Sequence, residues 1–453
     1  MTVDTIFALS TAPGRAGLAV IRVSGPGAGP ALDRLTGRAR PAPRRAVRAR
    51  LRDPQTSELI DHGLVLWFEA LASATGEDVA EFHIHGGRAV TADLIEVLGK
   101  CPGLRLARPG EFARRAFENG KLDLTAAEGL ADLIDADTKA QQKQALRQMQ
   151  GELGRLYESW RARLLTALAH FEATIDFSDE EIPDDLERRV VGEITALQGE
   201  ISRHLADGHR GERLRDGLHM AILGPPNAGK SSLLNLLAKR DAAIVSETAG
   251  TTRDVIEVHL DLAGYPLVVA DTAGLRDSSD EVEREGVRRA LKKAEASDLK
   301  LVVLDASQCL EPDPRTLEQM TGAALIVLNK CDLCDVGAPD PLPGFAAVPR
   351  VVMSVRTGEG VENLMAALEA ALALRFESKG DDPLITRARH REALEECRSA
   401  LARAAGAFSS GHEGPELAAE DLRLAARELG RITGRIDVED LLDVIFRDFC
   451  IGK

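Results

Sequence analysis

Residues 224–231, with the sequence GPPNAGKS, have the residue types and the spacing of a loop that binds nucleotide phosphates. The mostly apolar residues 219–223 predict a short buried strand before the loop, and residues 230–239 predict the helix after it. Backbone N–H groups at such a helix start point towards phosphate oxygens. Lys230 would reach the β- and γ-phosphates, and the Ser231 hydroxyl would ligate Mg²⁺. A chance glycine-rich turn is the alternative, and the flanking strand and helix count against it.

Two motifs downstream supply the remaining groups of a phosphate and magnesium site. Residues 251–254 (TTRD) offer Thr252 to the magnesium. Residues 271–274 (DTAG) follow an apolar strand and offer Asp271 to the magnesium and the Gly274 N–H to the γ-phosphate. The spacing therefore predicts a nucleoside triphosphate with its metal ion as the ligand.

The base is predicted from two further motifs. Residues 329–332 (NKCD) end in a carboxylate that can accept two N–H bonds from guanine, which adenine cannot offer, so GTP is expected rather than ATP. Residues 354–358 (SVRTG) would close over the base, where Val355 replaces the small alanine of many GTPases and leaves a backbone contact. The predicted GTP-binding residues are Asn227, Ala228, Gly229, Lys230, Ser231, Ser232, Ser246, Thr252, Asp271, Thr272, Ala273, Gly274, Asn329, Lys330, Asp332, Ser354, Val355 and Arg356.

Hydrolysis poses a problem, because the residue after DTAG is Leu275. A leucine can neither orient the attacking water nor neutralise the charge that develops between the β- and γ-phosphates. The side-chain carbonyl of Asn227 could hold a small cation against the phosphates, where an arginine finger would otherwise act. Acidic residues within 279–286 could orient the water, although a helix N-terminus in solvent also favours acids.

Length and composition describe a multidomain globular protein. A chain of 453 residues should hold about three domains, and 44% hydrophobic with 28% charged residues is typical of a soluble protein. No apolar run reaches the roughly 18 residues of a membrane span, so no membrane association is expected. Six cysteines do not make a disulfide framework in a chain of this length, and a cytoplasmic location is expected. Cys331 and Cys334 form a C-x-x-C pair, but Cys331 lies inside the guanine motif, which disfavours a redox or zinc role.

The charge is unevenly distributed. The net charge is −15, whereas residues 1–119 hold 16 Lys and Arg against 13 Asp and Glu. Eight arginines fall within residues 34–52. Two interpretations stay open at this point: contacts with RNA phosphates, or a solvated, mobile basic loop.

The pattern of elements predicts an α/β block between helical segments. Residues 1–119 mix strand and helix signals and predict an α+β domain, in which His83 and His85 share a strand face; packing is favoured over metal binding because no third ligand is suitably spaced. The expected elements are strands at 17–23, 63–68 and 78–85, helices at 90–98, 124–136, 139–175 and 186–205, a polar connector at 209–217, the GTPase block at 218–375, and helices at 386–405, 415–429 and 437–449. Insertion of the GTPase block into a helical domain is preferred to three consecutive units.

The chain ends in residues 449–453 (FCIGK), directly after an amphipathic helix. This ending lacks the arrangement needed for prenylation. A lone cysteine in an apolar segment, here Cys450, is usually part of a core. A functional tail is the alternative.

Taken together, these motifs closely resemble the MnmE (TrmE) family of tRNA-modification GTPases over essentially the whole chain. The resemblance rests on residues 12–17 (APGRAG), 21–25 (IRVSG), 75–78 (TGED), 85–87 (HGG), 108–112 (RPGEF), 116–123 (AFENGKLD), 224–232 (GPPNAGKSS), 250–254 (GTTRD), 271–276 (DTAGLR) and 450–453 (CIGK).

The resemblance implies an N-terminal folate-binding and dimerisation domain (1–119), an α-helical domain in two parts (120–216 and 378–453) and an inserted Ras-like GTPase domain (217–377). It implies a homodimer that works with the flavin enzyme MnmG, in a heterotetramer, on carbon 5 of the wobble uridine of certain tRNAs. 5-formyl-tetrahydrofolate or a related tetrahydrofolate would supply a one-carbon unit. GTP hydrolysis would depend on K⁺ and on pairing of the GTPase domains.

Site residues follow from the same resemblance, position by position. The implied K⁺ ligands are Asn227, Ser246, Thr248 and Thr251; the Mg²⁺ ligands are Ser231 and Thr252; Glu283 orients water; Arg22, Glu81, Lys121 and Lys453 bind folate; and Cys450 is catalytic. The alternative function is that of an Era/Der-like RNA-binding GTPase switch in ribosome assembly. Folate binding would separate the two.

Overall fold

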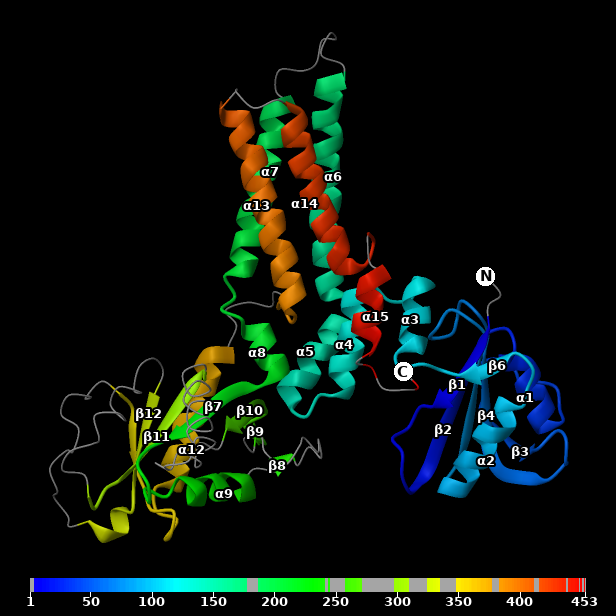
Figure 1. Ribbon diagram of the computed structural model, residues 1–453, viewed down its shortest axis with the longest axis horizontal. Coiled ribbons are helices and arrows are strands. Elements are labelled where there is room, and N and C mark those ends of the chain that lie inside the picture. Colours follow the sequence, from blue (N-terminus) through cyan, green and yellow to red (C-terminus); the bar gives the residue numbers. More distant parts are fainter. Residues whose placement is uncertain are drawn as a thin grey trace, which may run out of the picture. The chain divides into compact units, whose positions relative to one another are not determined.

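The computed structural model divides the chain into two compact units, residues 1–131, 147–200 and 393–453 in one and residues 132–146 and 201–392 in the other (Figure 1). The residues that the structure describes are 4–176, 186–240, 243–244, 257–270, 297–308, 324–334, 348–376, 383–410, 415–436, 439–447, 449 and 452. Among them, no helix is both long and apolar enough to cross a bilayer.

A six-stranded sheet forms the N-terminal part of the first unit, in the order β3-β4-β5-β2-β1-β6. Neighbouring strands are antiparallel except β1 and β6. Helices α1 and α2 cover one face, where Leu32 and Leu94 pack among the sheet residues Ile21, Leu51 and Phe82. The elements are β1 (Thr5–Leu9), β2 (Ala16–Ser24), α1 (Ala28–Thr36), β3 (Val47–Arg52), β4 (Leu59–Phe68), β5 (Val79–Gly86), α2 (Arg88–Gly99) and β6 (Leu104–Leu106).

The other face of this sheet is covered at the β1 end, where Phe112 of α3 (Glu111–Glu118) packs on Ile6 and Ala8. Helix α3 in turn packs against α4 (Leu124–Ile134) and α15 (Glu439–Arg447), through Ala113, Leu124 and Phe446. The last helix of the chain is thereby joined to the N-terminal sheet.

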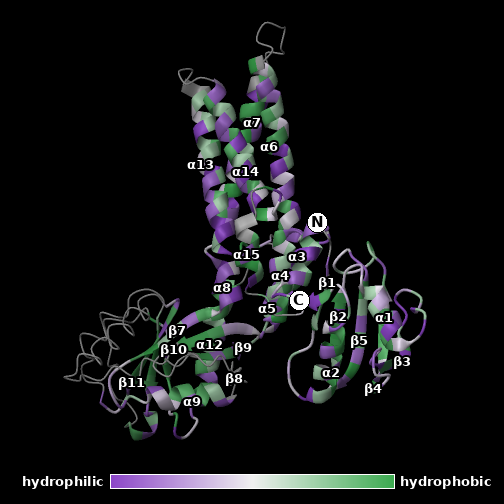
Figure 2. Ribbon diagram, turned by 45° about the vertical axis from the view of Figure 1, so that its right-hand side comes forward, coloured by the Kyte–Doolittle hydropathy of each residue, from purple (hydrophilic) through white to green (hydrophobic). Residues whose placement is uncertain are grey.

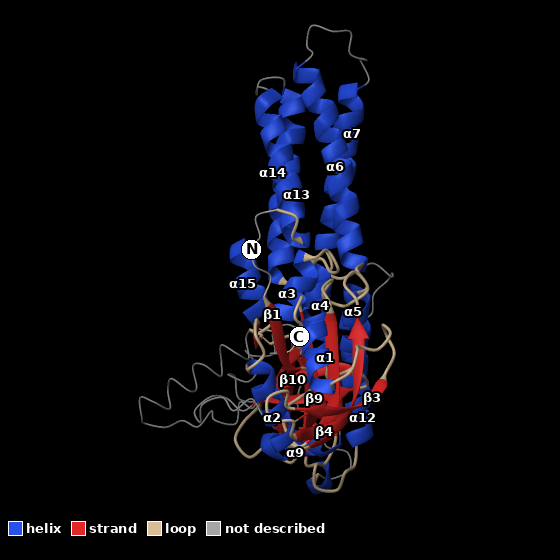
Figure 3. Ribbon diagram, turned by 90° about the vertical axis from the view of Figure 1, so that its right-hand side faces the viewer, coloured by secondary structure: helices blue, strands red, loops and turns tan. Residues whose placement is uncertain are grey.

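Four helices run side by side in the first unit, namely α6 (Glu152–Asp176), α7 (Leu186–Leu205), α13 (Ala388–Ser410) and α14 (Pro415–Thr433) (Figure 3). Their small and aliphatic residues at helical spacing face inwards, among them Ala418, Leu422 and Leu429 of α14. Glu200 of α7 accepts bonds from Trp160 (2.9 Å) and Arg163 (2.8 and 3.0 Å) of α6. Thr433 of α14 donates its hydroxyl to Glu158 of α6 at 2.5 Å, so segments before and after the α/β block pack on each other.

The second unit contains a seven-stranded sheet in the order β13-β12-β11-β7-β10-β9-β8, in which β9 alone runs antiparallel to its neighbours. Strands β7 and β10 carry the apolar colour in Figure 2, as expected for strands buried on both faces. The elements are α5 (Lys139–Met149), α8 (Arg210–Asp216), β7 (Leu218–Leu223), α9 (Lys230–Arg240), β8 (Ala243–Ile244), β9 (Glu257–Leu262), β10 (Tyr265–Ala270), β11 (Leu299–Asp305), β12 (Ala324–Asn329), η1 (Cys331–Leu333), β13 (Arg350–Val352) and α12 (Val361–Phe376).

The predicted fold class is confirmed, with three local corrections. Residues 34–52 are not a mobile loop, because they contain the end of α1 and strand β3. Residues 139–175 form two helices rather than one. They are separated at Gly151, whose φ of 79° is left-handed and cannot continue a right-handed helix. The expected polar connector contains α8, which buries Leu214.

Candidate functional site

A pocket of about 710 Å³ lies at the carboxyl ends of the parallel strands β7 and β12. Ligands bind at this edge of open α/β sheets because loops and helix N-termini converge there. The lining residues are Pro226, Asn227, Gly229, Lys230, Ser231, Ser232, Asn329, Lys330, Asp332, Leu333, Ser354, Val355 and Arg356. The structure thus brings together most of the predicted GTP-binding residues that it describes.

Backbone geometry explains the glycines of residues 224–231. Gly224 has φ 136°, and a Cβ there would collide with the carbonyl oxygen of Val303. Gly229 has φ 102°, and its Cβ would collide with the Asn329 amide. The Lys230 ammonium donates to the carbonyl oxygens of Gly224 and Pro225, at 2.8 Å each. These bonds hold Lys230 across the loop, with the Ser231 hydroxyl in the first turn of α9.

The base side of the pocket is preassembled by side chains of the predicted motifs. The Asn329 amide donates to the Ala228 carbonyl at 2.8 Å and accepts from the Val355 N–H at 3.1 Å, so it joins the phosphate loop to the last motif. The Lys330 ammonium lies 2.6 Å from the Asp305 carboxylate. Asn329 and Lys330 therefore connect three parts of the pocket: the phosphate loop, the end of β11 at Asp305, and residues 354–358.

Asp332 presents the carboxylate expected to read guanine. Ser354 donates its hydroxyl to one oxygen at 2.5 Å, and the exposed Arg356 guanidinium lies 2.5 Å from the other. The hydrogen bond from Ser354, reinforced by the charge of Arg356, lowers the pKa of the Asp332 carboxyl. The group is therefore ionised at neutral pH and acts only as an acceptor.

Several predicted site residues lie outside the described part of the chain. They are Ser246, Thr248, Thr251, Thr252, Asp271, Thr272, Ala273, Gly274, Glu283, Cys450 and Lys453.

The N-terminal sheet brings together two of the predicted folate residues. Arg22 of β2 and Glu81 of β5 are cross-strand partners, and their side chains form an ion pair of 3.0 Å. His83 lies 3.2 Å from the other oxygen of Glu81. The Arg22 guanidinium also lies 5.8 Å from the centre of the Phe112 ring. A cation and a carboxylate thus stand side by side on a partly exposed sheet face.

Of the other two residues predicted to bind folate, the structure describes Lys121 and not Lys453. Lys121 donates its ammonium to the Leu71 carbonyl rather than to the Glu81 carboxylate. Gly452, the neighbour of Lys453, accepts a bond of 3.0 Å from the Ser10 hydroxyl. Strand β1 ends at Leu9, beside Ile21 and one residue from the row of Arg22. Gly452 therefore lies next to the Arg22 row.

The two weaker motifs have structural explanations. His83 pairs with Glu81, and His85 lies 2.8 Å from Asp61. Within the described residues, no group of three or more His, Cys, Asp or Glu side chains is arranged to hold a metal ion. Burial and the neighbouring carboxylates of Glu359 and Asp332 raise the pKa of the Cys331 thiol, which makes it a poor nucleophile.

Comparisons with known proteins agree along the whole chain. Residues 5–121 match the family model described as GTP-binding protein TrmE N-terminus, and residues 124–450 match the MnmE helical domain. The tRNA modification GTPase MnmE of Parvibaculum lavamentivorans is 59% identical, over 99% of this chain and 100% of the relative. The mitochondrial 5-taurinomethyluridine-[tRNA] synthase subunit GTPB3 of Homo sapiens is 48% identical, over 99% of this chain and 93% of the relative.

The chain belongs to the MnmE family. A partial likeness to a solved structure, the G domain of the T. maritima FeoB iron transporter, covers 34% of this chain with 25% identity and a TM-score of 0.26, which adds nothing to that assignment.

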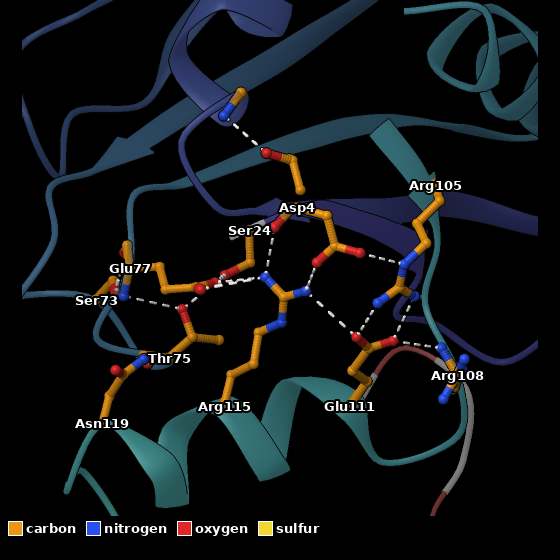
Figure 4. Close-up of polar contacts among 12 residues, drawn as sticks. Asp4, Ser24, Ser73, Thr75, Glu77, Arg105, Arg108, Glu111, Arg115 and Asn119 are labelled. Atoms are coloured by element: carbon orange, nitrogen blue, oxygen red, sulfur yellow. Dashed lines mark hydrogen bonds and ion pairs between the residues drawn. The ribbon is translucent and has the colours of Figure 1, made fainter. Parts of the chain in front are cut away.

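In this MnmE-family chain a buried cation supports the N-terminal site, and sequence reasoning gave it no role. Arg115 of α3 is 8% exposed. Its guanidinium donates to the Asp4 carbonyl (2.9 Å) and carboxylate (2.7 Å), to Glu77 (3.1 Å) and to Glu111 (3.3 Å). Burial lowers the pKa of Arg115, but these carboxylates, Glu77 foremost, raise it more. Figure 4 shows the guanidinium between acids from separate segments of the chain.

The network extends on both sides of Arg115. Glu111 is bound by Arg105 at 2.5 and 2.8 Å, and these bonds outweigh burial and lower the pKa of Glu111. On the other side, the Ser24 hydroxyl lies 2.7 Å from both Thr75 and Glu77. The network therefore ties residues 75–78 and 108–112, two of the quoted motifs, to the end of β2. No local signal in the sequence indicates this network, because partners such as Asp4 and Arg115 lie 111 residues apart.

Replacing Asp332 with asparagine should change the base that the pocket accepts. The asparagine amide has one acceptor oxygen where the carboxylate has two, and its NH₂ group would face a guanine N–H. GTP affinity should therefore fall by roughly a hundredfold or more, because a guanine donor is left unpaired. Binding of xanthosine 5′-triphosphate, which presents an oxygen at that edge, should rise. Nucleotide affinities from fluorescence titration test this; equal GTP affinity in both proteins would show that Asp332 does not read the base.

Replacing Arg115 with methionine should loosen the N-terminal unit. Three carboxylates would lose their buried counter-charge, at a cost of about 3–5 kcal/mol. Amide hydrogen exchange of the full chain should accelerate in β1, the 73–77 loop and α3. The matched control is Arg114→Met on the same helix, whose exposed ion pairs with Glu118 and Asp443 contribute at most about 1 kcal/mol. Equal exchange in the two variants would contradict a special role for Arg115.

Proposed function

We propose that this chain hydrolyses GTP and uses that cycle in modifying carbon 5 of the wobble uridine of certain tRNAs. The observation that carries the proposal is the pocket in which Lys230, Ser231 and the guanine-reading Asp332 lie together. The printed names of the relatives, tRNA modification GTPase and 5-taurinomethyluridine-[tRNA] synthase subunit, support tRNA as the substrate.

The phosphate side of the pocket would bind and orient the triphosphate. Lys230 would exchange its two loop carbonyls for the β- and γ-phosphate oxygens, since an ammonium prefers an anionic partner. Ser231 and Thr252 would hold Mg²⁺, with Asp271 nearby and the Gly274 N–H on the γ-phosphate. The hydroxyl at the N-terminus of α9 fits a hard cation that prefers oxygen ligands.

Asn227 would hold a potassium ion, with Ser246, Thr248 and Thr251, and Glu283 would orient the attacking water. Asn227 lines the pocket and has φ 65°, in the left-handed region. An asparagine tolerates that region better than most residues. When bound, K⁺ would supply positive charge near the phosphates, in place of the arginine of other GTPases.

The N-terminal site would bind 5-formyl-tetrahydrofolate or a related tetrahydrofolate through Arg22, Glu81, Lys121 and Lys453. Glu81 suits the amino and ring N–H edge of a pterin, and cations suit the glutamyl carboxylates. Gly452 beside Ser10 supports a position for Cys450 close to that ligand, where it would act chemically.

The wider assembly completes the proposal. We infer a homodimer formed through residues 1–119, working with MnmG in a heterotetramer, in the cytoplasm. The helical parts would be residues 120–216 and 378–453, with the GTPase domain at residues 217–377. Packing of α14 on α6 supports the insertion, since the two helices come from opposite sides of the GTPase block.

GTP turnover should fall about tenfold or more when K⁺ is replaced by Na⁺ at constant ionic strength. The reason is that Asn227 and the phosphate loop would hold K⁺, the larger of the two ions, against the phosphates. Asn227→Gly should remove the difference between the two salts. Glycine is the sharper choice than alanine, since it keeps the φ of 65° without strain. Asn227→Asp, which retains an oxygen, is the matched variant and should keep a K⁺ preference. Equal turnover of the wild type in both salts would refute the cation role.

Calorimetry of the full chain should detect binding of 5-formyl-tetrahydrofolate, and Arg22→Ala should weaken it by about 10- to 100-fold, the value of a charge-assisted bond. Arg88→Ala is the matched control: Arg88 is exposed on α2, on the opposite side of the sheet. Absence of binding by the wild type would favour the Era/Der-like RNA switch instead. Equal loss in both variants would contradict the assignment of Arg22.

A further inference from the structure

The N-terminal sheet has one face covered by helices and one face largely open. Along β3, Ala49 and Leu51 are buried with α1 and α2, whereas Arg48 and Arg50 alternate with them and are exposed. Side chains of adjacent strand residues point to opposite faces. Arg48 and Arg50 therefore project from the side of the sheet opposite α1.

Strand register shows what else lies on that side. Arg48 is opposite Leu64 of β4, which is opposite His83 of β5, and Arg50 is opposite His62. On the same side Arg22 is opposite Glu81, two residues from His83. We call this surface the open face; its members are Arg22, Arg48, Arg50, His62, Leu64, Glu81 and His83. It joins the Arg22–Glu81 pair to the arginines of β3.

The arginines of residues 34–52 differ in what they do. Arg40 pairs with Asp33 and lies 5.0 Å from the centre of the Trp67 ring, and Arg44 and Arg52 donate to backbone carbonyls. The side chains of Arg48 and Arg50 make no hydrogen bond or ion pair with any described residue. The one carboxylate of the open face, Glu81, is already paired. The open face thus carries uncompensated positive charge in a chain of net charge −15.

We propose that Arg48 and Arg50 bind backbone phosphates of the RNA whose uridine is modified. This inference rests on the proposed function: a uridine that receives a one-carbon unit held near Arg22 must approach the open face, and its flanking phosphates come with it. Alternate residues of a strand stand roughly 6.6 Å apart, so the two guanidinium groups can reach successive phosphates. The imidazoles of His62, opposite Arg50, and of His83, in the row of Arg48, can stack on unpaired bases.

A second copy of the chain fits this surface less well. A two-fold interface places the same patch of both subunits together, so it would bring Arg48 and Arg50 of both copies into one interface. The carboxylate of each patch, Glu81, is already paired and would not balance these four charges. A polyanion removes that repulsion, whereas a second open face adds to it.

The test compares two double variants of the full chain that remove equal charge. Arg48→Thr with Arg50→Thr clears the open face, and threonine suits a strand. Arg34→Ala with Arg38→Ala is the control, because α1 packs on the opposite side and neither arginine has a partner among the described residues. The probe is an unmodified tRNA transcript with a uridine at the wobble position. Affinity is measured by fluorescence anisotropy over a series of salt concentrations.

The open-face variant should bind the transcript at least about tenfold more weakly than the wild type. The slope of log affinity against log salt concentration should be smaller in magnitude by about two. The control should match the wild type, and GTP turnover should be unchanged in both variants. Equal losses in the two variants would overturn the proposal, because only net charge would then matter. A change from dimer to monomer in the open-face variant alone, seen by ultracentrifugation, would also overturn it. If the wild type itself does not bind the transcript, the proposed function in tRNA modification is contradicted, and this inference falls with it.

Discussion

The N-terminal unit depends on one buried cation. Taking a guanidinium out of water costs several kcal/mol unless carboxylates and carbonyls surround it. Arg115 meets that requirement with Asp4, Glu77 and Glu111, which come from the start of the chain, the loop before β5 and α3. The pairing therefore decides where these segments lie. Through α3 it also places Phe112 against Arg22, so the geometry of the candidate folate site follows from a charge that does not touch it.

Asn329 has a comparable part in the nucleotide pocket. It is 3% exposed, and its amide satisfies both a carbonyl of the phosphate loop and an N–H of the last motif. A buried amide that lost either partner would carry an unpaired polar group, at a cost of about 1–3 kcal/mol. The phosphate and base sides are thus held at a fixed separation by the protein's own hydrogen bonds. Binding energy from GTP need not be used to assemble them.

Sequence alone predicted what depends on local rules. The phosphate loop requires particular glycines at a strand end, and strands β2, β4 and β5 show apolar periodicity. Strand β3 was missed because its exposed side is all arginine, and α8 was missed because Leu214 is the one large apolar residue within it. The Arg115 network could not be predicted, since its partners lie up to 111 residues apart and a buried arginine has no local signature.

The end of the chain combines a steric constraint with a chemical one. Gly452 has φ 98°, and a Cβ there would collide with the Leu9 carbonyl oxygen, so only glycine lets the tail pass this closely to β1. The Ser10 hydroxyl then fixes the Gly452 carbonyl. The anchored carbonyl lies at the end of β1, one residue from the row that carries Arg22 and Glu81. The absence of a side chain at residue 452 is therefore what lets the backbone come so close to that row.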